Sequence, residues 1–226
     1  MSIINYIGNS DNKDNSDNID YTVKELNLSI KELNLSGKNL TELPCDIHKY
    51  TNLKILRCNI NKLTSINNLP SNLEILECSY NQLTILDNLP INLKVLDCRF
   101  NELTRLDNLP PNLEILQCNS NHITSLNNLP PNLTDLYCHH NSLTSLENLP
   151  IKLEIISCFS NKLTSLNNLP PNLQMLCCSN NQLTSLDNLP LSLVSLECDD
   201  NPFTYDFEPT LQNIRNYNAT RLLQSS

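Results

Sequence analysis

Cysteine is the residue type in this chain that is best suited to chemistry, and its spacing is regular. Eight of the ten cysteines follow one another at intervals of 20 residues. They are Cys58, Cys78, Cys98, Cys118, Cys138, Cys158, Cys178 and Cys198. Thiols at such positions could form disulfide bonds, bind a metal ion, or serve as small buried apolar side chains.

The spacing favours the third of these uses. Parallel strands one repeat apart would lie about 4.8 Å from each other, within reach of a disulfide. Side chains in register run alongside one another, however, and no particular pairing is favoured. Zinc needs a tetrahedron of converging ligands, whereas a single file of thiols offers too few, and the CxxC spacing is absent. We therefore expect buried, free cysteines in a reducing compartment.

No residues form a catalytic or cofactor-binding pattern, and we expect a protein that is not an enzyme. The four histidines lie beside no recurring nucleophile; they are His48, His122, His139 and His140. Carboxylates such as Glu77 and Asp97 occupy outward strand positions, where solvated charge is expected. The acidic group Glu197, Asp199 and Asp200 lacks the spacing of a calcium site and is also expected to be solvated.

The composition excludes other classes of function. The formal net charge is −9, which repels phosphate backbones and argues against binding nucleic acid. The chain has no run of Lys or Arg and no apolar stretch long enough to span a membrane. We expect a cytoplasmic, intracellular protein, a monomer, with the host cytoplasm as one possible setting.

The elements that position the cysteines come from a repeat of 20 residues, which runs without insertion from Asn52 to about Asn201. One unit, residues 72–91, reads NLEILECSYNQLTILDNLPI. A fixed period of this length predicts a solenoid in which each unit stacks on its neighbours. Because side chains alternate along a strand, Leu76 and Cys78 should face the core and Glu77 should face outward.

The rest of the unit predicts how the strand turns away. Asn81 recurs at the turn, where its side-chain amide could bond backbone groups that are otherwise unpaired. Leu83 and Leu86 should enter the core, and Leu89-Pro90 should be extended and polyproline-like. The chain has only two glycines, so we expect Asn to supply most of the turn residues with positive φ.

The repeated pattern LxxLxCxxNxLxxLxxLP resembles the leucine-rich repeat family. In one unit it is carried by Leu73, Leu76, Cys78, Asn81, Leu83, Leu86, Leu89 and Pro90. The resemblance covers roughly residues 33–205. The short period with its Leu-Pro ending looks most like the bacterial effector subclass. The Asn-rich version with a Cys in every unit is similar to leucine-rich repeat proteins of giant viruses. The resemblance implies a right-handed solenoid with a parallel sheet on the concave face and extended segments on the convex face.

The repeat also divides the chain. We expect a disordered or loosely ordered tail at 1–20, and an N-terminal cap with an irregular first repeat at 21–51. Period-two alternation from Tyr21 predicts strand there, and Ile47 and Tyr50 predict a short helical turn. The solenoid should cover 52–202. Residues 203–226 should form a C-terminal cap with a short helix starting near Pro209.

Residues that the scaffold does not dictate vary along the expected concave face. One column there is an exposed aliphatic row, and the middle units add the aromatic and Arg side chains that dominate protein interfaces. The candidate partner-binding residues are Ile75, Val95, Arg99, Phe100, Ile115, Tyr137, His139, Ile155, Phe159 and Cys177. Tyr80 and His140 lie on the rim beside them. Strand propensity alone is an alternative explanation of the aliphatic row. Cys177 has no basic neighbour in sequence, so we expect an inert thiol there.

These features predict a module that binds a protein partner through the concave face. One alternative is a substrate-recruiting subunit of a ubiquitin-ligase or effector complex, which would need a docking segment outside the repeats. Another is a structural protein that assembles end to end.

Overall fold

The computed structural model describes residues 28–187 and 189–224, the last three by their backbone alone. The tail expected at 1–20 and the alternating pattern at 21–27 lie outside these residues. Leu28 lies in a turn with an exposed side chain.

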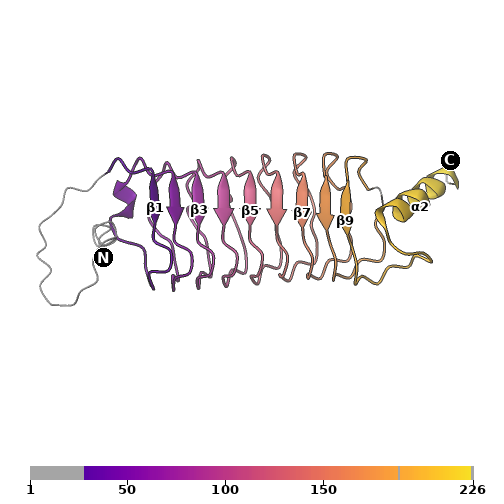
Figure 1. The fold of residues 1–226 in the computed structure, drawn as a ribbon, viewed down its shortest axis with the longest axis horizontal. Coiled ribbons are helices and arrows are strands. Elements are labelled where there is room, and N and C mark those ends of the chain that lie inside the picture. The colour runs from indigo at the N-terminus through magenta and orange to yellow at the C-terminus, as the bar shows by residue number, and fades with distance from the viewer. Residues whose placement is uncertain (1–27, 188, 225–226) are drawn as a thin grey trace, which may run out of the picture.

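The described residues form a solenoid around one parallel sheet (Figure 1). Its nine strands follow one another in chain order. They are β1 (Glu32–Asn34), β2 (Ile55–Arg57), β3 (Ile75–Glu77), β4 (Val95–Asp97), β5 (Ile115–Gln117), β6 (Asp135–Tyr137), β7 (Ile155–Ser157), β8 (Met175–Cys177) and β9 (Ser195–Glu197). Between β2 and β9, each residue of a strand pairs with the residue 20 positions later in the next strand, so that Leu76 lies beside Leu96. The predicted leucine-rich repeat solenoid is confirmed.

The core lies behind this sheet. The central residue of each strand points inward, and so does the residue two positions later, which is Leu35 after β1 and a cysteine after β2–β9, as strand alternation requires. The eight cysteines of the repeat are all buried and free, as predicted. Leu83 and Leu86 are buried behind them, with their equivalents in the other turns. One column of sulfur and several columns of leucine therefore run the length of the solenoid.

A ladder of asparagines satisfies the backbone where each strand ends. The Asn81 amide nitrogen donates to the carbonyl oxygens of Cys58, Cys78 and Ser79, at 3.0, 3.0 and 3.2 Å. Its Oδ1 accepts from the Leu63 backbone N–H at 3.0 Å. One side chain thus joins two successive turns, which confirms the predicted role of this column.

Two columns of residues turn the chain with positive φ. The first column holds six asparagines among the described residues, Asn68, Asn88, Asn108, Asn128, Asn148 and Asn168. The second column lies on the rim, just before the ladder, and holds Ile60, Tyr80, Phe100, Ser120, His140, Ser160, Asn180 and Asp200. The prediction that Asn supplies the positive φ is right for the first column and wrong for the second.

Backbone hydrogen bonds between successive turns explain the second column. The Tyr80 N–H donates to the Arg99 carbonyl at 3.1 Å, and the Asn81 N–H donates to the Phe100 carbonyl at 3.2 Å. These bonds set the backbone just before each ladder asparagine, whatever side chain is present. The left-handed conformation is therefore imposed by the scaffold and is not chosen by the residue type.

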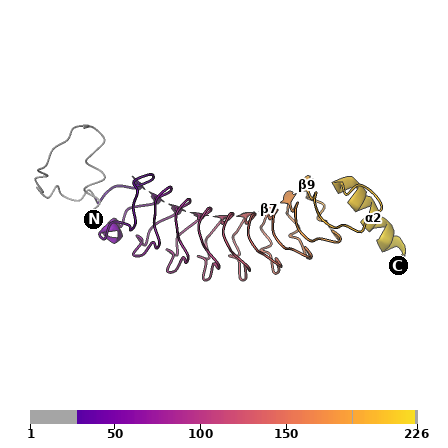
Figure 2. The same cartoon turned by 90° about the horizontal axis from the view of Figure 1, so that it is seen from below.

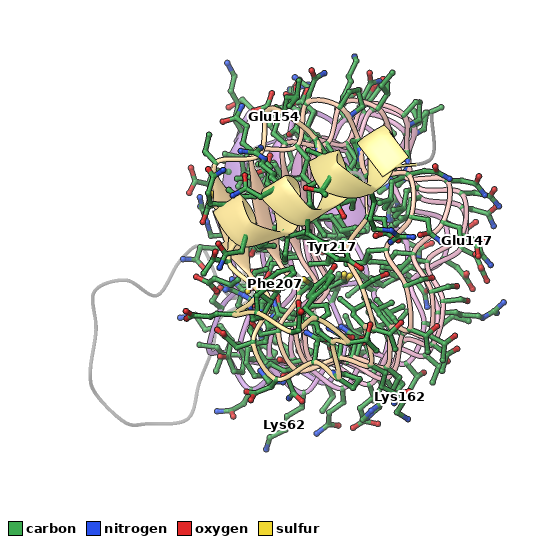
Figure 3. The ribbon with its side chains drawn as sticks, turned by 90° about the vertical axis from the view of Figure 1, so that its right-hand side faces the viewer. Lys62, Glu147, Glu154, Lys162, Phe207 and Tyr217 are labelled. Carbon is green, nitrogen blue, oxygen red and sulfur yellow. The ribbon has the colours of Figure 1, made fainter. Side chains whose placement is uncertain are left out.

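Both ends carry helical segments. A 3₁₀ turn, η1 (Ile47–Lys49), confirms the predicted helical turn in the first, irregular unit. At the other end α2 (Leu211–Gln224) lies across the last turn, where Ile214 is fully buried (Figure 3). The Arg215 guanidinium donates to the carbonyl oxygens of Pro190 and Leu193, at 2.8 and 2.9 Å. None of the helices in the described part of the chain is long and apolar enough to cross a membrane.

The solenoid is gently curved. Figure 2 shows the strands along the inner side of the curve and the connecting loops along the outer side. Seen end-on in Figure 3, Glu154 lies at one rim of the sheet and Lys62 and Lys162 lie at the other. Glu147 lies on the outer side. The sheet thus presents a shallow, open face between two rims.

Candidate functional site

We call the open face of the sheet the concave surface. It consists of the outward-facing side chains of β2–β9 and of the three residues that follow each strand, apart from the buried cysteine. These outward positions vary between units, whereas the inward positions are occupied by the same leucines, cysteines and asparagines in nearly every turn.

The aliphatic row of the concave surface is predicted to be exposed, but it is half-buried. Ile75, Val95, Ile115 and Ile155 all have this intermediate burial. Strand pairing explains it, because Ile75 lies in register with Val95, and each side chain covers one side of the next. The row therefore offers apolar side chains only along their outer edges. Met175, in the same row but outside the predicted set, is exposed.

Two candidate residues form the centre of an aromatic cluster. The rings of His139 and Phe159 stack, with centroids 4.3 Å apart and planes 10° apart. His140 meets Phe159 edge-on at 5.0 Å. The His139 Nδ1 lies 3.1 Å from the Ser157 hydroxyl oxygen, which also fixes the ring. This cluster brings together side chains from two successive turns.

Burial keeps His139 neutral. Desolvation lowers its pKa to about 4, and the neighbouring His140 and Arg99 act in the same direction. At neutral pH the ring is therefore an uncharged, largely apolar surface. Tyr137, on the strand that precedes it, is half-buried, and its pKa is raised by burial and by Asp135.

Arg99 is tied to Asp97 on the same strand end. The guanidinium Nε lies 3.2 Å from the Asp97 carboxylate. Asp97 is only 6% exposed, which corrects the prediction of a solvated carboxylate. Burial raises the pKa of Asp97, while Arg99 opposes that shift. Ser79, in the preceding turn, is buried as well and hydrogen-bonds the Asp97 carboxylate.

Phe100 belongs to a second aromatic pair. Its ring stacks on Tyr80 with centroids 4.3 Å apart and planes 11° apart. The two side chains remain 41% and 49% exposed, respectively. The sequence predicts Tyr80 on the rim and outside the candidate set, but its ring contacts the candidate residue Phe100. The signal in the sequence is that the two aromatic residues are 20 positions apart.

Cys177 lies near the C-terminal end of the surface. Its thiol lies 2.9 Å from the Glu197 carboxylate, and burial followed by Glu197 raises the pKa of Cys177 to about 12. Such a thiol is protonated and unreactive at neutral pH, in line with the expectation of an inert cysteine. Across residues 28–187 and 189–224, no group of three or more His, Cys, Asp or Glu side chains could hold a metal ion.

The structure therefore groups the candidates. Among the middle turns, Arg99 and Phe100 lie toward the N-terminal end, just after β4. Tyr137, His139 and Phe159 lie toward the C-terminal end, at β6 and β7. The aliphatic row runs alongside both, and Cys177 lies apart from them. The arrangement has the chemistry of a contact surface, with apolar and aromatic side chains, compensated charges and firmly held polar groups.

The sequence and fold of this chain were compared with those of known proteins. No protein-family model matches the sequence, and no curated protein matches it. Solved structures do match. The chain is 34% identical to YopM from Yersinia enterocolitica WA-314, with a TM-score of 0.74 over 82% of this chain. It spans only 41% of the length of that YopM chain.

Two further structures are similar. The leucine-rich repeat domain of a Shigella effector is 30% identical, with a TM-score of 0.56, over 87% of this chain and 77% of that one. The functional domain of InlJ from Listeria monocytogenes, which includes a cysteine ladder, is 31% identical, with a TM-score of 0.62. That match covers 83% of this chain and 47% of the InlJ chain.

Proposed function

We propose that this chain, which belongs to the leucine-rich repeat family, is a non-enzymatic module that binds a protein partner through its concave surface. The observation that carries this proposal is the contrast between fixed and variable positions. The inward positions repeat almost without change and are buried, while the outward positions of the same strands differ from turn to turn.

The middle turns supply the anchor residues. Three of these residues carry large rings, namely Tyr137, His139 and Phe159. The motion of the His139 ring is restricted, because it stacks on Phe159 and is hydrogen-bonded to Ser157. Rings that are ordered before binding lose little conformational entropy when a partner arrives. Aromatic side chains are also the type most often found among residues that dominate binding energy.

The proposal is tested with a double variant, Tyr137→Ala with Phe159→Ala. Tagged protein would be used to capture partners from cells that naturally express it, followed by mass spectrometry. We expect the specific partners of the unmodified protein to be lost. The matched control is Ile151→Ala with Leu191→Ala, which removes two exposed apolar side chains outside the concave surface. Equal capture by the double variant and the unmodified protein would contradict the proposal.

A second candidate is a recruiting subunit of a ubiquitin-ligase or effector complex. It is supported by the similarity to the Shigella effector domain, of which this chain covers 77%. This function needs a docking segment as well as the concave surface. Deleting residues 203–226 should then break assembly into the complex while binding to the concave surface persists, provided that the truncated solenoid stays folded by circular dichroism.

A further inference from the structure

Three apolar side chains project from the rim in successive turns, and we call them the apolar strip. They are Ile60, Tyr80 and Phe100, with φ of 56°, 54° and 52°. These values lie in the left-handed region, which Gly and Asn tolerate and other residues adopt only at a cost. For a β-branched residue such as Ile60 the conformation is a clear outlier.

The chain itself provides a comparison. The other column of positive φ is occupied by Asn in each of its turns from Asn68 to Asn168. Asn is therefore used where only the turn matters. On the rim, where the backbone is equally strained, Ile, Tyr and Phe are present instead, although Asn would relieve the strain.

Packing within the chain does not explain this choice. Ile60 is 64% exposed, and Tyr80 and Phe100 are about half exposed, despite their stacking. Side chains that bury so little of their surface gain little stability from it. Strained residues that the fold does not need are typical of functional surfaces.

The charges around the strip indicate what it contacts. The Arg57 guanidinium forms ion pairs with both Glu77 and Glu32, and Arg99 is paired with Asp97. The charged side chains of the sheet beside the strip are thus all held in ion pairs. They offer no unpaired cation or carboxylate to a charged partner, so an uncharged, apolar group fits the strip best.

We propose that the apolar strip is a specificity-determining contact for an uncharged, apolar, extended segment of the partner protein. The inference rests on the proposed function and names the chemistry of one part of the interface. Three residues in successive turns are separated by two intervals of about 4.8 Å, so the strip is about 10 Å long. That length accommodates two side chains from one face of an extended segment, which lie about 7 Å apart.

The first test measures strain and needs no partner. Ile60→Asn should raise the melting temperature by about 2–4 °C, because it relieves the left-handed conformation and removes little buried surface. Ile91→Asn is the matched control, since Ile91 is 65% exposed but does not have positive φ. We expect no rise for that variant. Equal effects of the two substitutions would overturn the argument from strain.

The second test measures recognition with defined probes. Three ten-residue peptides of alternating leucine–serine, lysine–serine or glutamate–serine sequence would be titrated against ¹⁵N-labelled protein. We expect the leucine–serine peptide alone to shift the amide resonances of Ile60, Tyr80 and Phe100. Its affinity should fall about tenfold in the Ile60→Asn variant. The proposal is wrong if no peptide shifts these resonances, or if a charged peptide shifts them more strongly.

The remaining outcomes separate this inference from the proposed function. If the Tyr137 and Phe159 variant loses its partners while Ile60→Asn retains them, the apolar strip is not part of the interface, although the concave surface is. If the unmodified protein self-associates in analytical ultracentrifugation and Ile60→Asn does not, the occupant is a second copy of this chain. Either result overturns the proposal for the strip.

Discussion

The side-chain amide of Asn101 donates a hydrogen bond to the carbonyl oxygen of Cys78, 3.1 Å away in the preceding turn. The same nitrogen donates to Cys98 at 3.0 Å, and Asn101 Oδ1 accepts from the Leu83 N–H at 3.0 Å. Because Asn101 is buried, no solvent can replace these bonds. The ladder therefore holds the turns together from inside and leaves the outward positions free to vary.

Removing one rung should be costly. Asn101→Ala leaves the Leu83 N–H without a partner and removes one of the two asparagine hydrogen bonds to each of the Cys78 and Cys98 carbonyls, so we expect a loss of about 2–4 kcal/mol in the free energy of unfolding. Urea denaturation followed by circular dichroism measures it. Asn112→Ala is the control, because that side chain is exposed and makes a single long bond of 3.4 Å. Similar losses for the two variants would show that the ladder is not a main source of stability.

The buried cysteines of the repeat should not react with thiol reagents in the folded protein. Burial raises the pKa of Cys118 to about 12, so its reactive thiolate stays scarce when the pH is raised from 7 to 9. We expect a maleimide reagent to label the exposed Cys45 quickly and the eight buried cysteines only in urea. Mass spectrometry of the labelled peptides measures this. Rapid labelling of Cys118 without denaturant would contradict the buried column.

His139 should make the fold sensitive to acid. Its pKa is lowered to about 4 in the folded chain, whereas an unfolded histidine titrates near 6.5. Between these values the unfolded state binds more protons, so this residue's contribution makes stability fall as the pH drops from about 6.5 to 4. Titration of the ring followed by NMR should give a midpoint well below 6.5. A midpoint near 6.5 would mean that the ring is not held against Phe159.

The C-terminal helix should depend on Arg215. Arg215→Ala removes bonds to the carbonyl oxygens of Pro190 and Leu193, and should destabilise the last turn by about 1–3 kcal/mol. Hydrogen exchange should then be faster in β9 and unchanged in β3. Arg221→Ala is the control, because its ion pair with Asp187 is exposed and should contribute little. Unchanged exchange in the Arg215→Ala variant would show that other contacts attach the helix.

The sequence predicts the scaffold well because the repeat samples the same environment many times. The inward cysteines and the bonding role of Asn81 follow from the 20-residue period together with strand alternation, while the parallel sheet is implied by the resemblance to the leucine-rich repeat family. The 3₁₀ turn at Ile47–Lys49 follows from local spacing.

The surface is harder to predict, because burial there depends on neighbouring turns. The sequence predicts that Asp97 is outward and solvated, yet its side chain is buried and bonded to Ser79 and Arg99. The left-handed conformation of Ile60 and Phe100 cannot be predicted for another reason. Hydrogen bonds between the backbones of successive turns impose it regardless of residue type. The conformational preferences of Ile and Phe therefore do not predict a left-handed backbone at these positions.

The most direct test of the central claim is hydroxyl-radical footprinting of the chain with and without its captured partner. If the concave surface is the binding site, oxidation of Tyr137, Phe159 and Phe100 should fall several-fold in the complex. Oxidation of Ile151 and Leu191, outside that surface, should not change. Protection of those two residues, with unchanged oxidation of the three rings, would contradict the account.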